Sequence, residues 1–295
     1  MARRTSLAGK VVLITGAARG IGAQTARVAA ARGARIALAG LEPERLEALA
    51  AELGPGHAWF ACDVTDQASV QAAVDGAVDR LGGLDVVHAN AGIGAAGTVA
   101  IAPVEVLLRV LDVNLTGVVR TVSAALPHVT ARRGYVMITA SSAAYGAFPG
   151  MSTYCASKAG VEHFANALRL EVAHKGVAVG TIHPAWIDTD LVRDQQAASA
   201  LFDETVDKLP GPAGARVSLE ACAEAIVDGM ERRRRKVHVP RGVAAMGVLK
   251  PLLHSAPVDW VVRRQARTMV PQLEAEVLAR GTWFGATSMG MGEKD

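Results

Sequence analysis

Residues 10–33, which read KVVLITGAARGIGAQTARVAAARG, decide the fold. Residues 10–15 are predicted to form a strand that is buried in a sheet, because all of them after Lys10 are apolar or β-branched. A glycine-rich turn follows at once, and residues 21–32 then carry the small apolar side chains of a helix that packs closely on a sheet. A strand, a tight turn and a helix in direct succession predict the first βα unit of an α/β domain.

The turn itself has glycines at positions 16, 20 and 22 and favours a nucleotide-phosphate site. Without side chains, the backbone can approach a pyrophosphate, whose charge is bound by the free N–H groups at the start of the following helix. We expect this site to be lined by Gly16, Ala18, Arg19, Gly20, Ile21 and Gly22.

The alternation of short apolar runs and longer Ala-rich stretches continues along the chain. Further strands are predicted at 35–39, 58–62, 85–90, 135–140, 177–183 and 237–239, and further helices at 43–53, 67–81, 103–129 and 152–175. Asp66 is a possible N-cap of the helix at 67–81. Continuous apolar strands separated by helices predict a doubly wound parallel sheet of the Rossmann type in a three-layer α/β/α domain. We assign this domain to residues 1–240 and a C-terminal extension to 241–295.

Composition excludes several classes of protein. The 31 basic and 28 acidic residues nearly balance, which argues against a nucleic-acid partner. Cys62, Cys155 and Cys222 are far apart and odd in number, which fits a reducing compartment. No apolar run reaches the roughly 18 residues of a membrane span, and the eight histidines have no metal-ligand spacing. We therefore expect a soluble cytoplasmic protein without a metal site.

Several motifs together carry a family resemblance. The turn has the spacing TGxxxGxG, Asn90-Ala91-Gly92 follows a predicted strand, and Tyr154 and Lys158 form a YxxxK pair. On these residues the chain resembles the short-chain dehydrogenase/reductase family over about residues 8–240. The resemblance implies a catalytic tetrad of Asn114, Ser141, Tyr154 and Lys158. It also implies cofactor contacts from Asp63, Val64, Asn90, Ala91, Gly92, Tyr154, Lys158, Pro184, Ile187 and Thr189.

The chemistry of the tetrad also follows from the residue types. Tyr154 and Lys158 are four apart, so both project from one face of a helix. A tyrosine has a pKa near 10, and a nearby ammonium favours its phenolate, which then exchanges a proton with an alcohol or ketone. Ser141 would hold the substrate oxygen in line with the phenol, although Ser142 is an alternative. The resemblance gives Asn114 a proton-relay role; alternatively, it only satisfies backbone groups at a helix irregularity.

The predicted activity is hydride transfer between a nicotinamide cofactor and a secondary alcohol or ketone. A nucleotide-sensing protein without chemistry is an alternative, which the intact tetrad disfavours. A membrane-peripheral dehydrogenase of lipophilic alcohols is another. A sugar-nucleotide epimerase is disfavoured by the glycine spacing and the chain length.

The end of the second strand bears on the choice between NAD and NADP. Gly40 stands where a carboxylate would bind the ribose of NAD, and Arg19 has the reach for a 2′-phosphate. Against this, Leu41 is not basic and Glu42 is close enough in sequence to bind the ribose. The balance marginally favours NADP.

For the substrate, the sequence offers an apolar hollow suited to an apolar alcohol or ketone. Ala185 adds a methyl group where the family often has glycine. Residues 190–216 are predicted to form a mobile flap over the cleft, in which Leu201 and Phe202 are apolar. The candidate pocket residues are Ile93, Ser141, Tyr145, Phe148, Met151, Trp186 and Leu191.

The C-terminal extension is where this chain departs most from the family pattern. Residues 231–267 hold ten basic and two acidic residues between apolar pairs. The extension is expected to pack on the domain or on a neighbouring subunit, because Pro251, Pro257 and Pro271 should interrupt any long amphipathic helix. Cover of the substrate cleft and contact with an anionic membrane are the alternatives. The family resemblance supports a homotetramer or homodimer.

Overall fold

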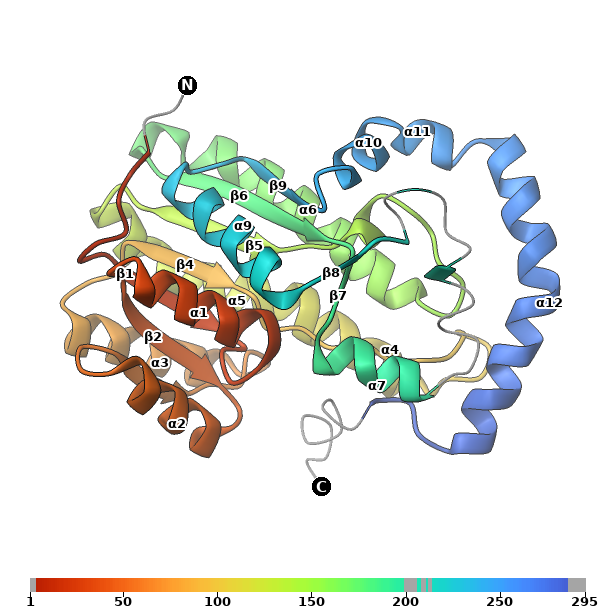
Figure 1. The fold of residues 1–295 in the computed structure, drawn as a ribbon, viewed down its shortest axis with the longest axis horizontal. Coiled ribbons are helices and arrows are strands. Elements are labelled where there is room, and N and C mark those ends of the chain that lie inside the picture. Colours follow the sequence, from red (N-terminus) through yellow and green to blue (C-terminus); the bar gives the residue numbers. More distant parts are fainter. Residues whose placement is uncertain (1–3, 199–205, 208–210, 212–213, 286–295) are drawn as a thin grey trace.

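The computed structural model describes residues 4–198, 206–207, 211 and 214–285. Its centre is a seven-stranded parallel sheet in the order β3-β2-β1-β4-β5-β6-β9 (Figure 1). The strands are β1 (Val11–Thr15), β2 (Arg35–Gly40), β3 (Ala58–Ala61), β4 (Val86–Ala89), β5 (Tyr135–Thr139), β6 (Ala178–Pro184) and β9 (Lys236–Val239). Two short strands, β7 (Trp186–Ile187) and β8 (Arg216–Val217), pair in parallel outside this sheet.

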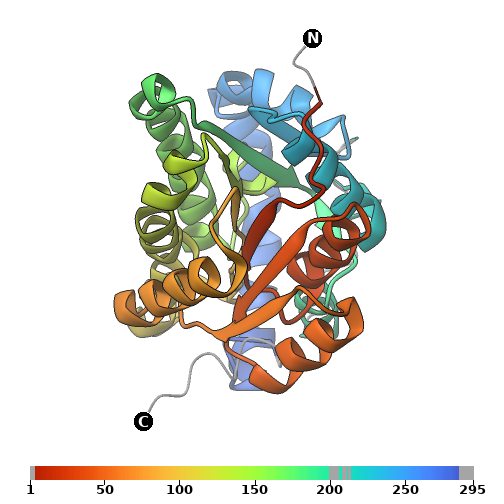
Figure 2. The same cartoon turned by 90° about the vertical axis from the view of Figure 1, so that its left-hand side faces the viewer.

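Helices cover both faces of the sheet, as the view in Figure 2 shows. One face carries α1 (Gly20–Ala31), α2 (Pro43–Leu53) and α9 (Leu219–Glu231). The other carries α3 (Gln67–Leu81), α4 (Val104–Leu111), α5 (Gly117–Ala131) and α6 (Ser152–Glu171). The predicted doubly wound Rossmann-type fold is confirmed.

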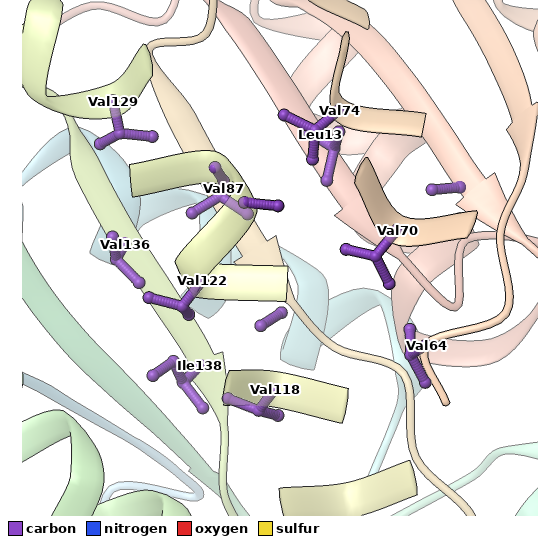
Figure 3. Close-up of a cluster of buried hydrophobic side chains, with 14 of the residues drawn as sticks. Leu13, Val64, Val70, Val74, Val87, Val118, Val122, Val129, Val136 and Ile138 are labelled. Atoms are coloured by element: carbon purple, nitrogen blue, oxygen red, sulfur yellow. The ribbon is translucent and has the colours of Figure 1, made fainter. Parts of the chain in front are cut away.

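Alternate residues of a strand pack on opposite faces of the sheet, which explains the long apolar runs of the inner strands. In β1, Val12 and Ile14 pack under α1 and α9, whereas Val11 and Leu13 pack under α3 and α5. Figure 3 shows the second of these clusters, which includes Leu13 of β1, Val87 of β4, and Val70 and Val74 of α3. All five residues of β1 are therefore buried, whereas half-buried polar side chains such as Arg35 and Lys236 stand at the first positions of β2 and β9.

The predicted boundaries agree with the structure within about two residues for most elements, and Asp66 caps α3 by accepting a hydrogen bond from the Ala68 N–H. The long helix predicted at 103–129 differs. It is divided by a π-helical turn, η1 (Asp112–Thr116), between α4 and α5. Asn114 lies on this turn, where one extra residue per turn re-aims its side chain. The predicted flap begins as a helix, α7 (Asp190–Ala198), and Leu201 and Phe202 lie outside the described residues.

The prediction that prolines prevent a long C-terminal helix is wrong. After α10 (Val243–Val248) and α11 (Lys250–Leu253), α12 runs unbroken over Ala256–Arg280. Pro257 lies in the first turn, where its missing N–H has no helical acceptor to lose. Pro271 lies inside the helix and removes a single backbone hydrogen bond, which the remaining turns tolerate.

The extension folds back on its own domain at both ends. Val243 of α10 is buried against Tyr145, and Gly247 lies so close that a Cβ there would be 3.1 Å from the tyrosine ring. At the far end, the Ala96 N–H donates to the Trp283 carbonyl (2.8 Å), and Thr98 donates to the Glu274 carboxylate (2.5 Å). The extension thus borders the loop that follows β4, on the side of the sheet edge where the site lies.

Candidate active site

The site begins at the carboxyl ends of the neighbouring strands β1 and β4. Adjacent parallel strands whose connections leave in opposite directions open a crevice there. The glycine turn between β1 and α1 lies against the loop after β4: a Cβ at Gly16 would be 2.8 Å from the Ala91 Cα. Gly16 and Gly20 also have positive φ (64° and 55°), a conformation that favours glycine.

Hydrogen bonds hold the two edges of this crevice together. The Thr15 hydroxyl accepts from the backbone N–H groups of Asn90 (3.0 Å) and Ala91 (3.2 Å). The Asn90 amide donates to the Thr15 carbonyl (3.1 Å), and its oxygen accepts from the Thr139 hydroxyl (3.1 Å). Asn90 is therefore a brace that joins β1, β4 and β5, in addition to bordering the cleft.

The glycine turn fits a pyrophosphate. Within the described chain no side chain caps the first turn of α1, so its leading N–H groups face the crevice without a side-chain acceptor. Gly22 faces inward: a Cβ there would meet the Gly16 carbonyl oxygen and lie 2.8 Å from the Asn90 amide. Gly22 therefore allows the close packing of the turn, while Gly16 and Gly20 allow access to it.

One continuous cleft contains most of the predicted cofactor residues. Of these, only Ala18 and Gly22 do not line it. The predicted lining residues are Gly16, Arg19, Gly20, Ile21, Gly40, Asp63, Val64, Asn90, Ala91, Gly92, Tyr154, Lys158, Pro184, Ile187 and Thr189. Further lining residues that the sequence did not single out as site residues include Cys62, Arg109, Val113, Thr139, Ala140 and Val192. They follow strand ends or come from helices, and no motif marks them.

Tyr154, Ser141 and Lys158 meet at one end of this cleft. Lys158 is buried on α6, with its ammonium 5.6 Å from the Tyr154 ring centre and donating to the Thr139 carbonyl (3.0 Å). Burial lowers the pKa of Lys158 to about 8. Burial also raises the pKa of Tyr154, while a hydrogen bond with Ser141 opposes that rise. This arrangement allows the Ser141 hydroxyl and the Tyr154 phenol to reach the same substrate oxygen.

Both serines of the pair lie at the cleft, but they are not equivalent. Ser141 lines the main cleft and contacts the Tyr154 hydroxyl, whereas Ser142 lines only a smaller adjoining hollow. The Ser141 hydroxyl also accepts from the Ala143 N–H (3.1 Å), which fixes the turn that presents it. This geometry favours Ser141 over Ser142 as the group that orients a substrate oxygen.

Asn114 is completely buried, and its side chain has partners on both sides. Its oxygen accepts from the Ile93 N–H (2.8 Å), and its amide donates to the Ile93 carbonyl (2.9 Å) and to the Ser157 hydroxyl (3.3 Å). These bonds satisfy backbone groups beside the π-helical turn, which is the structural role that the sequence left open. The proton-relay role stays a prediction.

The predicted substrate residues divide into two groups. Phe148, Met151 and Trp186 line the smaller hollow together with Ser141 and Tyr154. Ile93 and Tyr145, in contrast, are almost fully buried and line neither cavity, so assigning them to the substrate pocket needs correction. Ile93 packs in the core beside Asn114, and α10 covers the Tyr145 ring. Leu191 lies on α7, but the structure does not describe the position of its side chain.

Behind Ser141 lies a cluster of stacked rings that no motif in the sequence indicates. His183 stacks between Tyr145 (ring centres 4.6 Å apart) and His238 (5.3 Å). Its Nδ1 lies 3.2 Å from the Ser141 carbonyl oxygen, and because that oxygen only accepts, Nδ1 carries the proton and donates. Burial lowers the pKa of His183 to about 3, so the ring is neutral. His183 therefore anchors the backbone of Ser141 from behind, and α10 closes the cluster through Tyr145.

Arg19 and Glu42 form an ion pair beside the far end of the cleft, next to Gly40 and Leu41. The Arg19 Nε donates to one Glu42 carboxylate oxygen (2.8 Å), and its Nη2 donates to the other. Arg45 lies 3.3 Å from the same carboxylate. The Glu42 carboxylate raises the pKa of Arg19, which keeps the guanidinium charged.

In the described part of the chain, no three His, Cys, Asp or Glu side chains meet as a metal site would require. Nor does any described helix combine the length and apolarity that crossing a bilayer demands. A doubly wound sheet with a glycine turn at its switch point and a Ser–Tyr–Lys group beside it defines the class of dinucleotide-binding α/β oxidoreductases.

Comparison with known proteins places the chain within that class. The family model for short chain dehydrogenase matches residues 10–200. The chain is 41% identical over 194 residues to D-threitol dehydrogenase of Mycolicibacterium smegmatis, covering 63% of this chain and 73% of that protein. It is 34% identical over 232 residues to 3-alpha-(or 20-beta)-hydroxysteroid dehydrogenase of Mycobacterium tuberculosis, covering 76% and 89%.

A solved structure agrees with these relatives. The 3-ketoacyl-(acyl-carrier-protein) reductase from Brucella melitensis, complexed with NADH, superposes with a TM-score of 0.71 at 27% identity and covers 79% of this chain and 98% of that one. The chain therefore belongs to the short-chain dehydrogenase/reductase family and is an NAD(P)-dependent oxidoreductase.

Proposed function

We propose that the protein interconverts an apolar secondary alcohol and its ketone, with Tyr154 as the acid/base. The observation that carries this proposal is the meeting of Ser141, Tyr154 and Lys158 at the junction of the large cleft and the apolar hollow. Phe148, Met151 and Trp186 border that hollow and support an apolar substrate. The named relatives include a hydroxysteroid and a threitol dehydrogenase, so the family tolerates different alcohols.

In this proposal each side chain has a separate task. A nicotinamide cofactor supplies or accepts the hydride when it is bound along the cleft. Ser141 donates a hydrogen bond to the substrate oxygen and holds it beside the phenol. Tyr154 takes the alcohol proton during oxidation or returns it to the ketone during reduction. The Lys158 ammonium favours the Tyr154 phenolate, and Asn114 supports the helix turn that faces Gly92 and Lys158.

The buried ammonium of Lys158 makes stability depend on pH. Its folded-state pKa of about 8 lies below the ordinary 10.5. Between these values the unfolded state binds the proton and the folded state does not, so stability rises with pH. Below pH 8 both states are protonated, and the full cost of burying the charge is present. We expect urea unfolding to show a gain of up to about 3 kcal/mol between pH 7 and 10.5 relative to Lys158→Met. Equal pH profiles of the two proteins would contradict this.

The Arg19–Glu42 pair supports NAD(H) over NADP(H), the reverse of the marginal preference drawn from the sequence. Glu42 already engages the guanidinium that a 2′-phosphate would need, and its negative charge opposes a phosphate beside it. A nicotinamide dinucleotide without the phosphate leaves the pair intact.

The variant Glu42→Gln tests this preference. Removing the carboxylate charge frees Arg19, and we expect the NADP-to-NAD affinity ratio to rise by at least about tenfold, which is ~1.4 kcal/mol. Glu44→Gln, which removes an exposed charge from the first turn of α2, is the matched control and should leave the ratio unchanged. Gly40→Asp should move the ratio towards NAD, since a Cβ there meets only ordinary contacts of 3.7–3.8 Å. An unchanged ratio in Glu42→Gln would remove the pair as the selector.

The proposed activity is tested with purified protein and a panel of apolar ketones and secondary alcohols, followed by nicotinamide absorbance. Turnover of at least one pair supports the proposal. Cofactor binding without turnover of any compound would favour the nucleotide-sensing alternative. A homodimer or homotetramer is the assembly we propose, to be read from the molar mass in solution.

A further inference from the structure

Exposed apolar side chains recur from the end of α10, through α11, to the first turns of α12. Val248 is 79% exposed, Leu252 57% and Trp260 64%, and Leu249 and Val261 are exposed beside them. We call these five residues the elbow patch. In Figure 1 the bend between α11 and α12 lies at the edge of the molecule, away from the central sheet. Isolated apolar side chains on a surface are ordinary, but five within fourteen residues on a protruding bend indicate a contact surface.

Basic side chains outnumber acidic ones around the elbow patch, and of these Lys250 lies 3.9 Å from the buried Glu162 carboxylate. Residues 241–273 contain Arg241, Lys250, Arg263, Arg264 and Arg267, with Asp259 as the single acidic residue. The Asp259 carboxylate lies 3.6 Å from the Arg263 guanidinium, so its negative charge is compensated within α12. The Arg264 guanidinium lies over the Trp260 ring, 5.9 Å from its centre. An indole beside guanidinium groups has an apolar body and a charged rim, which is the combination found where proteins meet a lipid headgroup layer.

The sign of the charge decides between possible occupants. A two-fold contact with a second copy would bring the elbow patch and its arginines against the same arginines, and like charges would oppose the apolar contact. A surface of anionic lipid headgroups attracts the arginines and accepts the indole and aliphatic side chains at its boundary. Because α12 is continuous, Trp260, Val261 and the arginines at 263, 264 and 267 are held on a formed helix before any contact, so their binding does not require folding.

We propose that the elbow patch binds the surface of an anionic lipid bilayer. The helix lies on the bilayer without crossing it: Trp260 and Val261 enter the headgroup boundary, while Arg263, Arg264 and Arg267 neutralise lipid charge. The two ends of the extension stay docked on the domain through the Gly247–Tyr145 and Ala96–Trp283 contacts. This binding is separate from the oxidoreductase chemistry and does not require any site residue.

The test is co-sedimentation of the full-length protein with vesicles of phosphatidylcholine alone or with about one third phosphatidylglycerol. We expect binding to the anionic vesicles at least tenfold stronger than to the neutral ones, and weaker binding in high salt. Trp260→Glu and the double variant Arg263→Glu/Arg264→Glu should each lose the anionic binding. Leu170→Glu, which changes an equally exposed (67%) apolar residue on α6, should keep it.

The variants also report on the alternative occupant and on folding. Thermal melting and NADH binding should be the same in all variants, because the elbow patch lies outside the cofactor cleft. Equal sedimentation with both vesicle types, or anionic binding that survives in Trp260→Glu, would overturn the proposal. The proposal would also be overturned if neither the wild type nor any variant bound vesicles, and if the wild type formed a dimer that dissociated in Trp260→Glu. That result would assign the elbow patch to contact with a second copy of the chain.

Discussion

Replacing Tyr154 by phenylalanine is expected to lower kcat by about 10²–10⁴-fold, the range typical for the loss of a positioned acid/base group. The ring that packs beside Lys158 is retained, so the cleft keeps its shape, and the Kd of the cofactor should change by less than about twofold. The missing hydroxyl removes both the proton donor and the partner of Ser141. Steady-state kinetics and a cofactor titration of the same preparation separate the two effects.

Tyr135→Phe provides a matched control for this variant. Its hydroxyl donates to the Arg234 carbonyl (2.6 Å) in the core under α9, far from the cleft. Its loss should cost stability, by about 1 kcal/mol, and leave kcat unchanged. If Tyr154→Phe retained more than a tenth of the wild-type kcat, Tyr154 would not be the acid/base.

The second large effect is expected at Gly22. A methyl group there would overlap the Gly16 carbonyl oxygen and press on the Asn90 amide, both of which are fixed by the sheet. To make room, the glycine turn must move away from α1, which displaces the N–H groups that face the pyrophosphate. Overpacking of this kind costs about 1–3 kcal/mol. We therefore expect Gly22→Ala to weaken cofactor binding by about 10- to 100-fold and to lower Tm.

Gly40→Ala is the corresponding control in the same cleft. A Cβ at Gly40 would lie 3.7 Å from the Ala17 N and from Leu46, with no overlap. Its cofactor Kd and Tm should stay near the wild-type values. Unchanged cofactor binding in Gly22→Ala would mean that the turn does not form the phosphate site.

The fold could be predicted from the sequence because its signals are local. Each strand is a short apolar run, and the TGxxxGxG turn follows the first of them directly. A helix irregularity at Asn114 was one of two interpretations of the sequence, but its π-helical form could not be predicted, because an extra residue in a helix leaves no mark in the hydrophobic pattern. Likewise, α12 remains helical because Pro271 removes only one of the many backbone hydrogen bonds of a long helix. A rule that proline ends a helix does not weigh that loss against the bonds that remain.

The candidate site shows the same division. Apart from Ala18 and Gly22, the cofactor residues predicted from the motifs line the cleft, because they follow strand ends or lie on helices that the sheet positions. Tyr145 was misassigned since its neighbours in sequence, Ser141 and Phe148, do border the hollow. Tyr145 is kept out of the pocket by stacking on His183 and by cover from Gly247, and the second of these residues is more than one hundred positions away along the chain. Contacts of that separation are set by the tertiary fold and have no local signature.

The central claim is that the crevice at the carboxyl ends of β1 and β4 binds a nicotinamide dinucleotide and serves hydride chemistry. Titration of the purified protein with NADH and with NADPH, followed by nicotinamide fluorescence, tests it most directly. The account predicts saturable binding of NADH, with a Kd between about 1 μM and 1 mM as for ordinary enzyme ligands, and weaker binding of NADPH. Absence of saturable binding for both nucleotides would contradict the claim.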